Sequence, residues 1–213
     1  MTPGASVLLV LAVAFGAGTW LAISAGFQRL EYACKPAAMA ALAAMALTLH
    51  AHSSAQRALF VAALVLGLAG DVFLMLPRDY LIAGLVSFLL GHLAYIAGFR
   101  LLTFAALPAA AATAFLAAAA ALMLRHYIAG LRRTGRERLV GPVLLYAFVI
   151  SLTVVSAAGS RNWVALTGAL LFYLSDALFA WYRFVGPLRW GRPVNIVLYQ
   201  TGQALLALSL ATG

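Results

Sequence analysis

Charged residues cut this chain into apolar runs of about 20 residues, which is the length that an α-helix needs to cross the hydrocarbon core of a bilayer. The expected helices span residues 5–26, 34–50, 57–76, 80–98, 101–124, 139–158, 162–184 and 193–211. Only 9% of the residues are charged, whereas a soluble domain carries about 25%. The sequence therefore predicts an all-α integral membrane bundle of about eight transmembrane helices, forming a single domain over residues 1–213.

Prolines and short connections support this division. Pro36 is expected in the first turn of the second helix, and Pro108 is expected to kink the fifth helix from within. The N-terminal run lacks the basic start of a signal peptide, so we interpret it as a retained helix. The longest connection, residues 125–138, is basic and too short to form a soluble domain.

Basic residues fall mainly at alternate connections. Eleven of the 14 lie on one predicted side, namely Arg29, Lys35, Arg78, Arg125, Arg132, Arg133, Arg136, Arg138, Arg183, Arg189 and Arg192. Because basic loops stay in the cytoplasm, this side is predicted to be cytoplasmic and both termini to lie outside. The formal net charge of +9 then favours contact with a membrane surface over nucleic acid. Abundant Ala and Arg favour a bacterial inner membrane.

The five acidic residues fall into two groups. Glu31, Asp79 and Glu137 stand beside basic residues at helix joints, where solvated loop charges are the simplest interpretation. Asp71 and Asp176 lie inside apolar runs, at depths of roughly 8 and 12 Å from the predicted cytoplasmic ends of their helices. An ionisable group inside the membrane is costly and marks a functional site by default.

The two buried aspartates are expected to act together. They occupy nearly the same layer in the cytoplasmic half of the membrane, and each follows a small residue, Gly70 or Ser175, which allows a neighbouring helix to approach. No basic residue is obliged to neutralise them. Low dielectric and a second nearby carboxylate both favour the protonated form of a carboxyl group, so such a pair can hold a proton near neutral pH.

Other polar groups cluster near this layer and are predicted to contact substrate. They are Lys35, Ser87, His92, Tyr95, Tyr146, Ser175, Asn195, Tyr199 and Gln203. Three of them, Asn195, Tyr199 and Gln203, are spaced four residues apart and share one face of the last helix. For any single tyrosine, serine or glutamine, interhelical hydrogen bonding is the alternative interpretation.

No metal or cofactor is predicted. Of the four histidines only His92 is expected inside the membrane, so no three-ligand set emerges, although zinc held by His92 and both aspartates remains an alternative. No nucleophile elbow or phosphate loop is present. Asp71 and Asp176 stand 105 residues apart, a spacing that fits a parallel duplication of four helices.

A set of short motifs in order along the chain resembles the YhhN-like membrane family. They are Lys35-Pro36 and residues 70–74, 88–95, 146–151, 172–176 and 199–203. Leu178-Phe179-Ala180 departs from the usual family pattern, as does Gln200 where a second tyrosine is common. These departures concern the expected pocket lining more than the two acids.

The resemblance implies an enzyme, because the animal members of this family are lysoplasmalogenases. Such an enzyme hydrolyses the vinyl ether bond of a lysophospholipid to a fatty aldehyde and a glycerophospho head group, with no protein partner implied. The chemistry needs one protonated acid and one carboxylate, as paired carboxylates provide in glycosidases. Asp71 and Asp176 are the expected catalytic pair, and Lys35 with arginines of the inner loops is expected to hold the phosphate.

Two other functions fit paired membrane acids. A proton-coupled transporter also uses such acids as proton relays, but the loops are short and no pair of broken helices stands out. A lipid-binding membrane protein without catalytic activity is the third interpretation.

Overall fold

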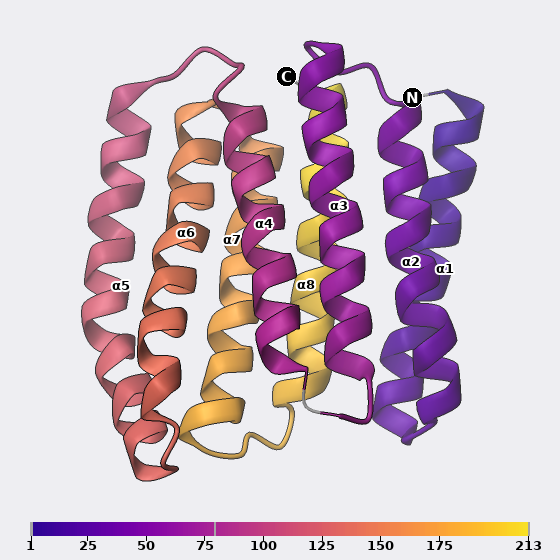
Figure 1. The fold of residues 1–213 in the computed structure, drawn as a ribbon. Coiled ribbons are helices and arrows are strands. Elements are labelled where there is room, and N and C mark those ends of the chain that lie inside the picture. Colours follow the sequence, from indigo (N-terminus) through magenta and orange to yellow (C-terminus); the bar gives the residue numbers. More distant parts are fainter. Residues whose placement is uncertain (1, 79, 213) are drawn as a thin grey trace.

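The structure, a computed structural model, describes residues 2–78 and 80–212, and within them it is helical without strands. Eight of the described helices are long and apolar enough to cross a membrane, which confirms the predicted all-α membrane bundle. They are α1 (Pro3–Ala25), α2 (Gln28–Thr48), α3 (Ser54–Met75), α4 (Leu81–Phe99), α5 (Ala106–Arg133), α6 (Val140–Gly159), α7 (Trp163–Ala180) and α8 (Gly191–Leu208) (Figure 1). Asp79, predicted to be a loop charge, lies outside the described residues.

Helix α2 begins six residues before the expected start at residue 34. Pro36 therefore lies inside the helix, and the prediction that it falls in the first turn is wrong. The added turns carry Glu31 and Lys35, both of which are buried. Each has an oppositely charged partner on another helix, so the charges enter the bundle as pairs instead of ending the helix.

Helix α5 extends further into the basic segment than expected. It runs to Arg133, so much of the predicted 125–138 loop is helical. Arginine is a good helix former, and Arg132 and Arg133 in the last turn interact favourably with the helix dipole. Pro108 lies in the first turn of α5, where proline is tolerated, and not at an internal kink.

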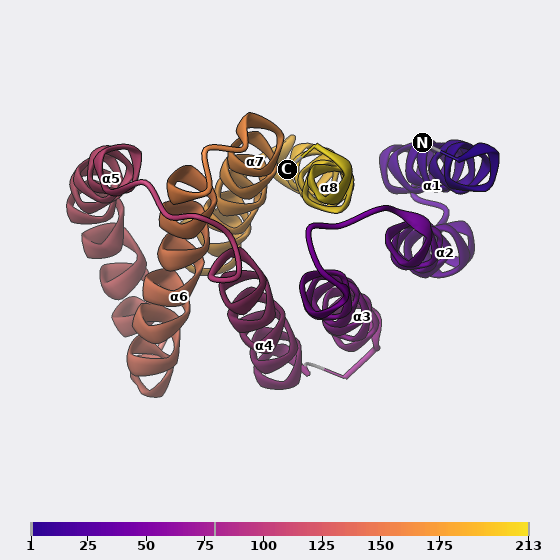
Figure 2. The ribbon, with the colours of Figure 1, turned by 90° about the horizontal axis from the view of Figure 1, so that it is seen from above.

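Most helices that follow one another in sequence pack as antiparallel neighbours, but α4 packs against α6 and not against α5. Helix α8 also contacts α1, α2 and α3 (Figure 2). The backbones of α7 and α8 approach each other closely at Gly168 and Gly202. A Cβ atom on Gly202 would lie 2.8 Å from the carbonyl oxygen of Gly168, so a side chain there would push the two backbones apart. Small residues at such crossings are typical of membrane bundles.

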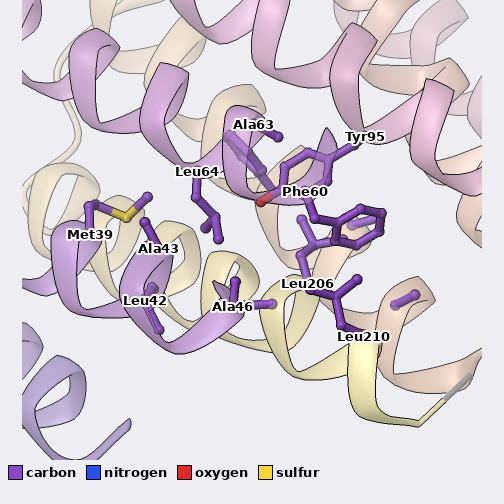
Figure 3. Close-up of a cluster of buried hydrophobic side chains, with 14 of the residues drawn as sticks. Met39, Leu42, Ala43, Ala46, Phe60, Ala63, Leu64, Tyr95, Leu206 and Leu210 are labelled. Atoms are coloured by element: carbon purple, nitrogen blue, oxygen red, sulfur yellow. The ribbon is translucent and has the colours of Figure 1, made fainter. Parts of the chain in front are cut away.

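The main apolar core takes residues from all eight helices, and its part between α2, α3, α4 and α8 lies in the half of the bundle nearer the chain termini. Figure 3 shows Phe60 beside Tyr95 and Leu206, with Leu64 lying between Phe60 and Met39. The rings of Phe60 and Tyr95 pack edge to face with centroids 5.0 Å apart, a geometry that adds to the energy of burial. This packed half leaves the opposite end of the bundle for a cavity.

Both chain ends lie on one face of the bundle (Figure 1). The connections that carry most of the basic residues lie on the opposite face, and its assignment to the cytoplasm stays a prediction. The predicted duplication pairs α2 with α6 and α4 with α8. Helix α2 contacts α8, and its counterpart α6 contacts α4, so the two contacts correspond. The predicted duplication fits this arrangement and likewise stays a prediction.

Candidate functional site

A cavity of about 320 Å³ opens at the end of the bundle opposite the chain termini. Helices α2, α3, α4, α6, α7 and α8 all contribute to its lining, and both Asp71 and Asp176 face it. Its α2 and α8 side is polar. On the other side Leu85, Phe88 and Val143 form an apolar stretch next to Tyr146 and Asp176.

Asp71 is held as an ion pair. The Nζ atom of Lys35 lies 2.9 Å from Asp71 Oδ1, and Tyr199 Oη donates a hydrogen bond of 2.9 Å to Oδ2. Asp71 is 1% exposed, so these donors replace the water that a free carboxylate would bind. The expectation that no basic residue neutralises the aspartates is therefore wrong for Asp71, because the longer α2 brings Lys35 against it.

A chain of buried polar groups supports Tyr199 from behind. Tyr95 Oη donates to Gln203 Oε1 at 2.7 Å, and Gln203 Nε2 lies 3.5 Å from Tyr199 Oη. These residues connect α4 and α8 to the carboxylate on α3. Since buried polar groups are stable only when they are hydrogen-bonded, the chain fixes the direction of the Tyr199 hydroxyl.

Asp176 has a different set of partners. Tyr146 Oη on α6 donates a hydrogen bond to Asp176 Oδ2, and His92 Nε2 on α4 lies 3.8 Å from the same oxygen. Among the described residues no lysine or arginine forms an ion pair with Asp176. Its side chain is 21% exposed, so it reaches the cavity more openly than Asp71 does.

The structure separates the predicted contact residues into two layers. Lys35, Tyr146, Asn195 and Tyr199 line the cavity together with the aspartates. The others lie behind this lining and are buried, namely Ser87, His92, Tyr95, Ser175 and Gln203. Asn195 also joins α8 to α7, because its Nδ2 donates to the backbone oxygen of Ser175 at 2.6 Å.

The mouth of the cavity contains an ion pair that the sequence did not predict. Glu31, expected to be a solvated loop charge, is 4% exposed and accepts hydrogen bonds of 2.7 and 2.8 Å from Arg192. Glu31 and Lys35 are four residues apart, so both side chains point to one face of a helix; this spacing was the available signal. Glu137 is exposed, as predicted.

A π-helical segment, Trp181–Val185, follows α7 and shapes the same mouth. It carries Tyr182, whose hydroxyl lies 3.4 Å from Asn195 Oδ1, and Phe184, which also lines the cavity. Nothing in the residue pattern distinguishes this segment from a continued α-helix. Such segments occur often at functional sites.

No group of three or more possible metal-ligating side chains occurs among the described residues. The two acids, the tyrosines and His92 thus offer proton transfer and hydrogen bonding as the chemistry of the cavity.

Comparison with known proteins identifies the family. The YhhN family model matches residues 30–210. The chain belongs to the YhhN family. The YhhN match begins after α1 and includes every residue that lines the cavity except Gln28.

Two relatives show how far the likeness extends. The chain is 29% identical to lysoplasmalogenase TMEM86B of Homo sapiens over 153 residues, which are 69% of this chain and 61% of the relative. It is 31% identical to lysoplasmalogenase TMEM86B of Sus scrofa over 154 residues, or 70% and 62% of the two chains. This YhhN protein thus spans somewhat less than two thirds of the length of the relatives it matches. No solved structure matches it.

Proposed function

We propose that this YhhN-family protein hydrolyses the vinyl ether bond of a lysoplasmalogen, releasing a fatty aldehyde and a glycerophospho head group. The observation that carries the proposal is that two aspartates with different partners face one cavity. Acid-catalysed hydrolysis of a vinyl ether needs one carboxylic acid and one carboxylate, as in glycosidases. The names of the relatives support the same reaction.

Asp176 is assigned as the acid and Asp71 as the carboxylate. The proton of Asp176 goes to the β-carbon of the vinyl ether, and the electron pair of the double bond forms the new C–H bond, leaving an oxocarbenium ion. Asp71, as the carboxylate paired with Lys35, stabilises that cation. Water then adds to the α-carbon and its proton returns to Asp176. The resulting hemiacetal breaks its bond to the glycerol oxygen, giving aldehyde and alcohol, with one water consumed overall.

The cavity suits a single-chain amphiphile. Its polar side, toward α2 and α8, receives the head group, and its apolar stretch receives the first part of the hydrocarbon chain. At about 320 Å³ it lies at the small end of ligand pockets, so the rest of the chain extends into lipid. Both Arg192 and Lys35 have a carboxylate partner, but the Arg192 side chain is 59% exposed at the mouth and the Lys35 side chain is only 7% exposed. Arg192 is therefore the preferred phosphate ligand.

A direct assay tests this function. The purified full chain in lipid vesicles is given a lysoplasmalogen, and aldehyde is measured. The matched control is the lysolipid with a saturated alkyl ether, which has no double bond to protonate. We expect aldehyde from the vinyl ether alone. Transport or binding of the lipid without aldehyde would overturn the proposal and favour the carrier or the lipid-binding protein.

A further inference from the structure

His92 is buried behind Asp176, on the side away from the cavity. It lies on α4, is 1% exposed, and its ring packs on Phe172 with centroids 4.5 Å apart. Both ring nitrogens have polar neighbours on α6, namely Tyr146 and Thr153. These two residues are seven apart and therefore share one face of α6. The imidazole thus spans two turns of the neighbouring helix.

The contacts of Thr153 bear on which ring nitrogen carries the proton. Its hydroxyl donates to the backbone oxygen of Val149 at 3.3 Å, one turn earlier in α6. A hydroxyl has one proton to donate. When Thr153 keeps its bond to Val149, Thr153 Oγ1 is the acceptor toward His92 Nδ1, which lies 3.2 Å away. In that arrangement the proton of the neutral imidazole is on Nδ1, since the hydrogen bond made by one ring nitrogen sets the state of the other.

The remaining nitrogen, Nε2, then presents a lone pair to the candidate acid. Tyr146 Oη lies 3.4 Å from Nε2 and also donates to Asp176 Oδ2. The Tyr146 hydroxyl therefore has one proton and two acceptors. If Asp176 is a carboxylate, it takes that proton and leaves Nε2 without a donor. If Asp176 is protonated, its own O–H donates to Tyr146, and Tyr146 donates to Nε2.

We propose that His92, locked as the Nδ1–H tautomer by Thr153, is a positioning residue that keeps Asp176 protonated and ready to donate. The inference rests on the proposed function. In this resting state Asp176 is protonated, so the bond between Asp176 and Tyr146 runs opposite to the one that a carboxylate accepts from Tyr146. Hydrogen bonds then run from Asp176 through Tyr146, His92 and Thr153 to Val149, and every donor has an acceptor. When the vinyl ether takes the acid proton, the Tyr146 hydroxyl turns back to the carboxylate. The proton released by the attacking water restores the first state, so none is gained or lost in a turnover.

Nitrogen-15 NMR of the histidine-labelled full chain tests the tautomer without turnover. The ring-nitrogen signals of neutral His92 should identify Nδ1–H in the wild-type protein. Thr153→Val keeps the shape of the side chain but removes the acceptor, and should shift His92 toward the Nε2–H form. Thr19→Val is the matched control, because Thr19 is also buried and donates only to a backbone oxygen one turn back, that of Phe15. An Nε2–H tautomer in the wild-type protein would overturn the inference, even if Thr153→Val failed to fold.

Kinetics give the second measurement. Thr153→Val should lower kcat about tenfold, the effect of one lost hydrogen bond, with little change in KM, whereas Thr153→Ser should restore kcat. Equal kcat for the wild-type protein, Thr153→Val and Thr19→Val would overturn the positioning role. If wild-type protein forms no aldehyde, the proposed function fails, while the NMR measurement still decides the tautomer.

Discussion

The two aspartates of the cavity occupy corresponding helices, α3 and α7, and yet their surroundings differ. Asp71 receives a lysine from α2 and a tyrosine from α8, whereas Asp176 receives a tyrosine from α6 and faces a histidine on α4. A permanent cation favours the ionised form of a carboxyl group, and a second acceptor favours the protonated form. Under the proposed function, this difference in partners prepares the same residue type for opposite roles in one bundle.

The largest effect is expected from removing each titrating group. Asp176→Asn should lower turnover about 10²–10⁴-fold, as loss of a general acid does, and leave the thermal unfolding midpoint near that of the wild-type protein. Asp71→Asn should cost similar activity and also stability, because Lys35 loses its counter-ion. Aldehyde formation and thermal unfolding in detergent measure the two quantities.

Glu137→Gln, on an exposed residue, is the matched control and should change neither quantity. The double variant with both Asp→Asn changes should be scarcely less active than the worse single variant, because residues that act as a unit are not additive. Near wild-type turnover in both single variants would remove the catalytic assignment.

Replacing Lys35 tests the difference between the two aspartates through the stability of the protein. Lys35→Met leaves the buried Asp71 without its cation, so we expect a destabilisation of about 3–5 kcal/mol. Adding Asp71→Asn to Lys35→Met should recover much of the unfolding midpoint without recovering activity. A stable Lys35→Met protein with raised KM and unchanged kcat would instead support Lys35 as the phosphate ligand.

The two tyrosines offer a smaller and more selective contrast. Tyr146→Phe removes the hydroxyl that links Asp176 to His92, and we expect kcat to fall about tenfold or more. Tyr199→Phe removes one donor from Asp71 but leaves Lys35, so its effect should be only a few-fold. The reverse order of the two kcat values would contradict the assignment of Asp176 as the acid.

The smallest expected effect comes from chelators. Because the proposed steps use only carboxyl, hydroxyl and imidazole groups, EDTA or phenanthroline should leave aldehyde formation unchanged. If activity disappears and zinc restores it, Asp176 and His92 would be metal ligands, and their description as a proton-holding unit would be wrong.

The apolar runs were enough to predict the eight helices and to single out the two membrane aspartates. The start of α2 was not predictable in the same way, because the charges in its first turns are neutralised by residues distant in sequence, such as Arg192 for Glu31. A single sequence does not show which helices become neighbours. For the same reason Thr153 passed unnoticed, since a threonine in an apolar helix ordinarily bonds only to its own backbone.

Helices α1 and α5 stand at the two edges of the bundle and bury few of their residues (Figure 2). Side chains such as Val10 and Phe115 project outward, with 66% and 65% of their surfaces exposed. Lipid tails are as apolar as leucine, so exchanging one outward apolar residue for another changes little. A charge at the centre of such a helix costs about 2.5–3.5 kcal/mol. A complete substitution map should therefore show two stripes, on α1 and α5, that accept any apolar residue and reject charge, flanking a centre that accepts almost no change.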